Sequence, residues 1–239
     1  MKKLLLGTVL LTATAGMAAA QDVVRIGTEG AYPPYNFIND ANEVDGYDID
    51  VANEVCARAE LTCEWVTNDW DSIIPNLVSG NYDAIAAGMS ITDERDEVID
   101  FTQAYYPPDP SAYAGLDEID VTSAVVAAQA ATIQATHVAE SGATLVEFAT
   151  PDESVAAVRN GEADAVLADK GFLVPIVEED PDLVFIGEDV MLGKGIGIGL
   201  RESDTELKEK MDAALASMKE DGKMAELLEK WFPGMDPDF

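Results

Sequence analysis

The sequence predicts an α/β protein, and three observations carry this prediction. Short apolar runs typical of strands alternate along the chain with segments whose apolar residues recur at helical spacing. Repeated strand–helix units of this kind favour mainly parallel sheets flanked by helices. The chain has 239 residues, of which 48% are hydrophobic and 25% charged, so it is globular and long enough for two domains.

The first half of the chain contains three expected strands, at 23–27, 63–67 and 83–87. A turn-rich segment, 28–34, follows the first strand. Asp48 or Asp50 is expected to cap the helix that comes next and ends near Ala59. Further helical segments are expected at 71–79, which stops at Gly80, and at 92–98.

The second half repeats this alternation. Strands are expected at 121–128, 144–148, 163–168 and 183–186, and helices at 134–141, 152–160 and 171–177. After a glycine-spaced run at 195–199, Ser203 and Glu206 have the spacing of a capping box. Two final helices are expected from the apolar positions Leu207, Met211, Ala214, Leu215 and Met218, then Met224, Leu227, Leu228 and Trp231.

Two segments have the character of crossings between lobes. The segment 105–110 carries three prolines, which favour extended chain, and the glycine run at 195–199 is the second candidate. An outward and a return crossing would leave one lobe discontinuous, with 21–106 and 195–239 in lobe 1 and 107–194 in lobe 2. In such folds a ligand binds in the crevice at the carboxyl ends of the strands.

Composition excludes many kinds of function. A formal net charge of −32 makes nucleic acid and anionic membranes poor partners, because their phosphates are repelled. The single histidine, His137, lies on a predicted helix and is interpreted as a helix-face residue. With only two cysteines besides, the chain is a poor candidate for a metal site or a Ser-His-Asp triad, and no cofactor is expected.

Residues 1–20 have the pattern of a signal peptide. Lys2 and Lys3 precede an apolar stretch, 4–11, and Ala18-Ala19-Ala20 forms a cleavage site before Gln21. The stretch is short for a membrane span, so a membrane anchor is the weaker alternative, and no cysteine follows for lipid attachment. We therefore expect a soluble periplasmic protein whose mature chain carries 12 basic and 46 acidic residues, a net charge of −34.

Export makes a disulfide the favoured interpretation of the two cysteines. Cys56 comes late in a helical pattern and Cys63 begins an extended run, so a bridge would tie a helix end to the next strand. A redox-active pair is the alternative, but it usually has two residues between the sulfurs. We predict a structural bridge.

Several longer motifs resemble one family. They are IGTEGAYPPYNF at 26–37, GYDID at 46–50, DWDSIIPNL at 69–77, DAIAAGMSITDER at 83–95 and AVLAD at 165–169. The C-terminal part also matches, from GIGL at 197–200 through WF at 231–232. Together they resemble the extracytoplasmic solute-binding proteins of polar amino-acid ABC transporters, and the Cys56/Cys63 pair matches the basic amino-acid binders. The resemblance covers nearly the whole mature chain and is weakest at 109–142.

This resemblance implies a two-lobed periplasmic-binding-protein type II fold with a two-segment hinge. The implied function is capture of a polar amino acid by lobe closure and its delivery to an inner-membrane permease, without covalent chemistry. A monomer is expected. The rival function is a periplasmic cyclohexadienyl (arogenate/prephenate) dehydratase, which resembles the same family and would need a general acid. A receptor sensor domain is disfavoured, because no transmembrane or signalling segment follows Phe239.

The family resemblance also implies the residues that hold the amino-acid backbone. Gly88 contributes main chain, Ser90 and Arg95 hold the carboxylate, and Asp169 takes the ammonium. Arginine suits this role because it grips a carboxylate through two parallel hydrogen bonds. The alternatives are a solvated ion pair of Arg95 with a neighbouring acid and a helix-capping role for Asp169.

The side chain of the ligand is expected to lie between Tyr32 and Trp70, where the family stacks rings. Core packing is the alternative for both, and it is the favoured interpretation of Trp65, which lies inside a strand. Glu29 matches a carboxylate that the basic amino-acid binders point at the distal cation, with an exposed loop glutamate as the alternative. Because Glu29 and Asp48 both match acidic positions of those binders, a cationic ligand such as arginine, ornithine, lysine or an opine is predicted.

The second lobe departs from the family pattern. The usual Gly-Thr-Thr-Gln-like turn is replaced by Ala131-Thr132-Ile133-Gln134. Thr132 can still offer its hydroxyl and N–H to the ligand. Ala131 replaces the glycine and Ile133 a hydroxyl residue, so either a hydrogen bond is lost or an apolar part of a larger ligand is accommodated.

Overall fold

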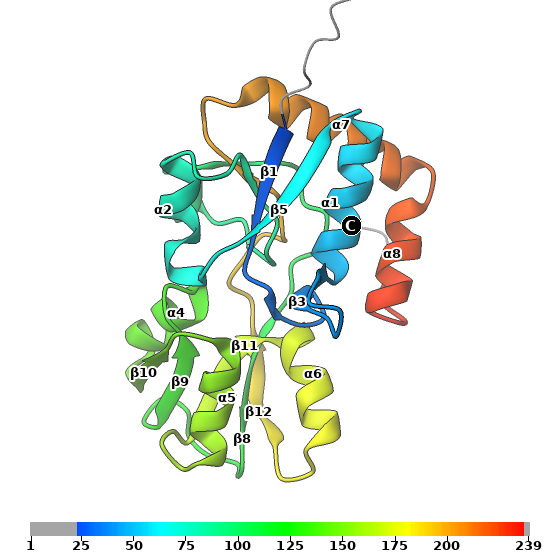
Figure 1. Ribbon diagram of the computed structural model, residues 1–239. Coiled ribbons are helices and arrows are strands. Elements are labelled where there is room, and N and C mark those ends of the chain that lie inside the picture. The colour runs from blue at the N-terminus through cyan, green and yellow to red at the C-terminus, as the bar shows by residue number, and fades with distance from the viewer. Residues whose placement is uncertain (1–22, 237–239) are drawn as a thin grey trace, which may run out of the picture.

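The computed structural model describes residues 23–236, and the predicted signal peptide lies outside the described residues. Two sheets, each flanked by helices, lie one above the other, joined by extended segments between them (Figure 1). Over the described residues, no helix combines the length and the apolarity that crossing a membrane requires.

The first sheet has the strand order β5-β1-β6-β13-β7. Its strands are β1 (Val23–Thr28), β5 (Thr62–Thr67), β6 (Ala84–Ile85), β7 (Asp100–Phe101) and β13 (Gly199–Leu200). β1 pairs in parallel with β5 and β6, whereas β13 is antiparallel to both of its neighbours. A strand from the late part of the chain therefore completes a sheet that the early part begins.

The second sheet repeats this pattern in the order β10-β9-β11-β8-β12. Its strands are β8 (Ser111–Gly115), β9 (Val125–Gln129), β10 (Thr144–Phe148), β11 (Ala165–Asp169) and β12 (Val184–Val190). β9 is parallel to β10 and β11, and β8 is antiparallel to β11 and β12. Both sheets are thus mixed, because four strands of each run in the same direction and one runs in the opposite direction. The reversed strand, β13 in the first sheet and β8 in the second, is the first strand along the chain after a crossing.

The helices cover the faces of both sheets, and a separate small antiparallel sheet follows β1 in the chain. The helices are α1 (Tyr47–Arg58), the 3₁₀ turn η1 (Trp70–Ser72), α2 (Ile73–Val78), α3 (Asp93–Asp96), α4 (Ile133–Ser141), α5 (Pro151–Arg159), α6 (Lys170–Glu179), α7 (Thr205–Glu220) and α8 (Lys223–Trp231). The small sheet contains β2 (Ala31–Tyr32), β3 (Asn36–Ile38) and β4 (Val44–Asp45). The last two helices pack against α1 through buried apolar residues, including Val51, Val55, Met211, Leu215 and Leu228.

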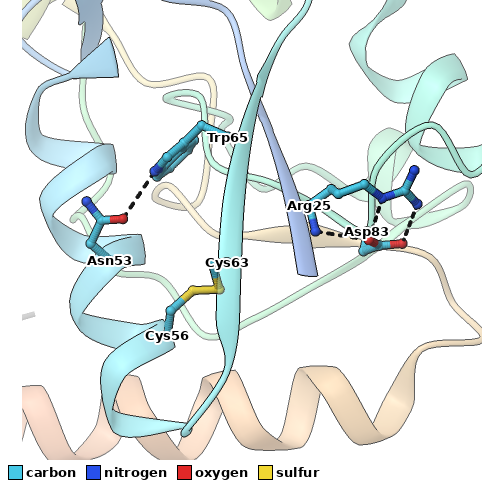
Figure 2. Close-up of a disulfide and its surroundings, with 6 residues drawn as sticks. All are labelled: Arg25, Asn53, Cys56, Cys63, Trp65 and Asp83. Atoms are coloured by element: carbon cyan, nitrogen blue, oxygen red, sulfur yellow. Dashed lines mark hydrogen bonds and ion pairs between the residues drawn. A yellow bond between two sulfur atoms is a disulfide. The ribbon is translucent and has the colours of Figure 1, made fainter. Parts of the chain in front are cut away.

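The predicted disulfide is present. Cys56 near the end of α1 is bonded to Cys63 in β5, across a Cα–Cα distance of 6.3 Å (Figure 2). Trp65, two residues further along the same strand, donates from its indole to Asn53 of α1 (3.1 Å) and packs against the main core while remaining half-buried. The helix and the edge strand are therefore joined at two places.

The two crossings lie side by side. Tyr105 N–H donates to the Ile196 carbonyl (2.8 Å), and Ile196 N–H donates to the Tyr106 carbonyl (3.1 Å). Gly195 has φ +105°, and a Cβ there would lie 2.8 Å from the Tyr106 carbonyl oxygen. Glycine is required at this position because it allows both the backbone conformation and the close approach of the two segments.

Several local predictions were wrong. α1 begins after Gly46, and Asp48 lies inside the helix, where it accepts hydrogen bonds from Asn36 (2.9 Å) and Tyr105 (2.7 Å) and caps nothing. α7 has Asp204 as its N-cap, and no side-chain cap bond is formed, so the predicted capping box is absent. The strand expected at 121–128 starts at Val125, and β8 was missed, because three alanines and glycines in five residues give little strand signal.

Candidate functional site

A cavity lies between the two sheets, where the parallel strands of both end. The space between the atoms that line it is about 330 Å³, including open solvent at its mouth. All eight residues predicted to contact a ligand line this one cavity, together with four others: Glu29, Tyr32, Trp70, Gly88, Ser90, Arg95, Thr132 and Asp169, then Ala87, Gln129, Ile133 and Gln134. Its position agrees with the general rule that ligands bind at the carboxyl ends of strands in α/β sheets.

Arg95 is positioned by the short helix α3. The Thr92 hydroxyl accepts a hydrogen bond from Arg95 N–H and so caps this helix (3.2 Å), while the guanidinium donates to the Ser90 carbonyl (2.9 Å). The guanidinium also lies over the Trp70 ring, 5.3 Å from its centroid. Within residues 23–236, no carboxylate forms a salt bridge with Arg95, and neighbouring Asp93 pairs with Lys194. The alternative of a solvated ion pair is therefore wrong.

The surroundings of Arg95 leave its charge incompletely compensated. Burial lowers the pKa of its guanidinium to about 10, while Asp169 and Glu94 act in the opposite direction. The guanidinium still carries its charge at neutral pH. A half-buried cation without a salt bridge is a suitable anchor for an incoming carboxylate.

Asp169 ends β11 and is buried, with 7% of its surface exposed. Its carboxylate accepts hydrogen bonds from the Tyr32 hydroxyl (2.9 Å) and from the Gln134 amide (2.7 Å). It precedes α6 as the N-cap residue, but its side chain makes no capping bond. Burial, followed by the nearby charge of Asp109, raises the pKa of Asp169 to about 7, against the influence of Tyr32 and Arg95.

Glu29 follows β1 and is half-buried, so it is not the exposed loop glutamate of the alternative. Its Oε1 accepts a hydrogen bond from the Gln129 amide, which comes from the other sheet (2.6 Å). The pKa of Glu29 is raised to about 7, chiefly by burial and in smaller part by the charges of Asp69 and Asp152. The bond from Gln129 favours the ionised carboxylate and opposes these influences.

The two predicted aromatic residues lie in the cavity wall and are each 9% exposed. The Tyr32 ring stacks on Phe172, with 4.6 Å between centroids. Trp70 donates from its indole to the Ala131 carbonyl of the other sheet (3.2 Å). Both rings thus combine core packing with a polar contact at the cavity, whereas Trp65 does not line it.

Gly88 and Ser90 follow β6 and bring main chain to the cavity. Gly88 has φ +62°, and a Cβ there would lie 3.4 Å from the Tyr32 ring, so glycine suits both the backbone and the space. Asp48 does not line the cavity, although it was expected near the ligand. It is fully buried, and its carboxylate accepts a hydrogen bond from the Asn36 amide. The amide oxygen of Asn36 in turn accepts a hydrogen bond from Gly30 N–H (2.7 Å).

The altered turn of the second sheet keeps the backbone shape that glycine usually provides. Ala131 has φ +59°, a left-handed conformation that is strained for alanine. The Thr132 hydroxyl caps α4 by accepting from Ala135 N–H (3.1 Å) and donates to the Gln129 carbonyl (2.7 Å). Ile133 lines the cavity, whereas His137, also on α4, does not.

Sequence reasoning missed two polar residues of the cavity. Gln129 ends β9, and Gln134 lies in the first turn of α4; they hold Glu29 and Asp169 respectively. A polar residue at the end of an apolar strand was the available signal for Gln129. No group of His, Cys, Asp and Glu in the described part of the chain has the arrangement of a metal site.

Hydrogen bonds cross the cavity from one sheet to the other. The pairs are Tyr32 with Asp169, Glu29 with Gln129, and Trp70 with the Ala131 carbonyl. Tyr35 also donates to Asp109 (2.6 Å), which accepts from Gly171 N–H (3.2 Å) at the start of α6. The structure is therefore a closed one, with residues of both halves lining the cavity and hydrogen-bonded across it.

Comparison of this chain with known proteins finds one family and several similar solved structures. Residues 24–234 match the family described as bacterial extracellular solute-binding proteins, family 3. A solved structure of a periplasmic His/Glu/Gln/Arg/opine family-binding protein from Silicibacter pomeroyi, in complex with lysine, is similar. Its sequence is 67% identical, the TM-score is 0.86, and the match covers 88% of this chain and 97% of that one.

Curated relatives from Escherichia coli K12 are similar over nearly their whole length. ABC transporter arginine-binding protein 1 is 30% identical, over 98% of this chain and 100% of the relative. The histidine-binding periplasmic protein is 34% identical, over 97% of each.

Proposed function

Because this chain belongs to the bacterial extracellular solute-binding proteins of family 3, we propose that its cavity binds a free amino acid with a positively charged side chain. The protein is the amino-acid-binding component of an ABC transporter, not an enzyme.

One observation carries the proposal: the cavity contains one cation, Arg95, and two buried or half-buried acids, Asp169 and Glu29. A basic amino acid presents the complementary set of one carboxylate and two cations. A neutral amino acid would leave Glu29 without a charged partner in a closed cavity, which is costly. The similar Silicibacter structure holds lysine, and curated relatives are named for arginine and histidine, which supports the same class.

We assign the residues as follows. Arg95 binds the ligand carboxylate, assisted by Ser90 and by main chain at Gly88, because it is the charged donor without a salt bridge. Asp169 binds the α-ammonium, held in place by Tyr32 and Gln134. Glu29 binds the distal cation, and the rings of Tyr32 and Trp70 flank the aliphatic stem. Thr132 contributes its N–H, because its hydroxyl already caps α4.

The transport context belongs to the same proposal. Export by the signal peptide at 1–20 places the mature monomer in the periplasm, and closure of lobe 1 (21–106 and 195–239) on lobe 2 (107–194) presents the ligand to a membrane permease. The ligand contacts both lobes, so it stabilises the closed form over the open one. The similarity to ABC transporter arginine-binding protein 1 of Escherichia coli supports the permease as partner.

A thermal-shift panel tests the ligand class. The mature protein, freed of carried ligand by unfolding and refolding, is heated with each of the twenty amino acids, ornithine and octopine. Ligand at a hundred times its Kd stabilises by about 2.7 kcal/mol, which gives a clear rise in Tm. We expect arginine, lysine or ornithine to raise the Tm. A rise with glutamine or glutamate, and none with the basic compounds or octopine, refutes the proposal.

Two further measurements complete the test. Native mass spectrometry of freshly purified protein weighs the amino acid carried from the host and identifies it directly. Incubation with prephenate or arogenate should release no phenylpyruvate or phenylalanine. Glu29→Gln should lose affinity for basic amino acids while keeping the fold, because the substitution removes charge and little volume.

A further inference from the structure

Glu29 and Gln129 meet across the cavity although they come from different sheets. Glu29 follows β1 of the first sheet, and Gln129 is the last residue of β9 in the second. Gln129 Nε2 lies 2.6 Å from Glu29 Oε1, and only 8% of Gln129 is exposed. This contact exists only while the two halves of the protein are together.

The orientation of the Gln129 amide follows from its partners. Nε2 donates to Glu29 and also to the Ala149 carbonyl (3.1 Å). Both partners are acceptors, so the amide nitrogen must face them. In a flipped amide, Gln129 Oε1 would face the Glu29 carboxylate oxygen and the Ala149 carbonyl oxygen, with no donor among the three. Gln129 Oε1 accepts no hydrogen bond from residues 23–236, and the residue lines the cavity. A ligand cation near Glu29 would therefore find a carboxylate and an amide oxygen as neighbours.

The charges around Glu29 make the Gln129 bond important. Asp69, in the loop before η1, and Asp152, in α5, both disfavour a negative charge on Glu29, as does its burial. Arg95 and Asp169 lie in the same cavity with opposite charges. The hydrogen bond from Gln129 is the influence that favours the ionised form of Glu29. Only the ionised form can pair with a ligand cation.

We propose that Gln129 is a positioning residue for recognition of the ligand side chain. It holds the Glu29 carboxylate, in its charged form, at the place where the distal cation of the ligand arrives. This inference rests on the proposed function, since it requires a cationic ligand. It also links charge recognition to closure, because the donor and the carboxylate come from opposite sheets.

The test compares arginine with citrulline, its neutral analogue, by calorimetry and by displacement at pH 6 to 9. Gln129→Met removes the amide at nearly constant length, and we expect it to lower the arginine-to-citrulline affinity ratio at least about tenfold, the range for a lost hydrogen bond to a charged group. The pH at which arginine affinity reaches half its plateau should rise by about one unit or more. Packing alone would not move this midpoint.

Gln134→Met is the matched control. Gln134 holds Asp169, which faces the α-ammonium common to both ligands, so this variant should weaken arginine and citrulline alike and leave their ratio unchanged. If Gln129→Met does not fold, Gln129→Asn shortens the amide by one methylene and withdraws the donor.

The outcomes separate the two proposals. If the unmodified protein binds none of arginine, lysine, ornithine and octopine, the proposed function fails. If it binds arginine, and the Gln129 variants keep both the affinity ratio and the pH midpoint, the role of Gln129 is refuted while the ligand class stands. A lower ratio together with a raised midpoint supports the inference.

Discussion

Lowering the pH from 8 to 6 should weaken binding of a basic amino acid by up to roughly a hundredfold. In the ligand-free closed protein, the pKa values of Glu29 and Asp169 are both raised to about 7, chiefly by burial. Pairing with the two ligand cations favours the ionised carboxylates and lowers both pKa values. Binding therefore releases protons, and affinity falls as the pH drops through the ligand-free pKa values.

The size of the effect follows from these values. A group with a pKa of about 7 that must be ionised in the complex reduces the apparent affinity about twofold at pH 7 and roughly elevenfold at pH 6. Two such groups acting independently multiply to about 120-fold at pH 6, and coupling between them would broaden the transition. At pH 8 the reduction is about 1.2-fold, so the affinity there is close to its plateau.

Isothermal titration calorimetry at pH 6, 7 and 8, in buffers of different ionisation enthalpy, measures affinity and proton release together. Glu29→Gln removes one of the two groups, so its affinity for a neutral amino acid should fall only about tenfold between pH 8 and pH 6. An affinity for arginine that is constant over this range, with no proton released, would refute the reasoning.

Three further predictions follow from single contacts. Arg95→Ala should abolish detectable binding in calorimetry while the Tm of the empty protein stays within a few degrees, and normal affinity would contradict the assignment. Replacing Cys56 and Cys63 by alanine should lower the unfolding free energy in urea by roughly 2–3 kcal/mol without altering affinity, since the bridge closes a short loop far from the cavity. Ala131→Gly should stabilise the protein by about 0.5–1 kcal/mol by relieving a left-handed alanine, whereas Ala130→Gly should destabilise it; equal effects would exclude strain.

Much of the fold could be predicted from local patterns. Alternating apolar runs located most strands and helices, the cysteine spacing predicted the bridge between α1 and β5, and the motifs around Gly88 and Arg95 indicated the family. These features depend on neighbours in the chain, so a single sequence contains them. The eight predicted site residues were found together for a related reason: most of them end or follow parallel strands, which end at one edge of each sheet.

Other features depended on partners far away in the chain. Asp48 has the position of a helix cap in the sequence, but Asn36 and Tyr105 draw its carboxylate into the core. β8 and β13 are short and rich in alanine or glycine, and they become strands because their neighbours supply the hydrogen bonds. Local propensity is weak in such segments, and tertiary pairing outweighs it.

The sequence by itself determined the fold class, the disulfide and eight of the twelve residues that line the cavity. Only the tertiary structure decided how those residues are paired: Glu29 with Gln129, Asp169 with Tyr32 and Gln134, and Arg95 with no carboxylate among the described residues. The physical reason is that hydrogen bonds across the cavity join residues far apart in the chain, 100 positions for Glu29 with Gln129 and 137 for Tyr32 with Asp169. Their geometry is fixed by the packing of two sheets on each other, and no local pattern of residues records it.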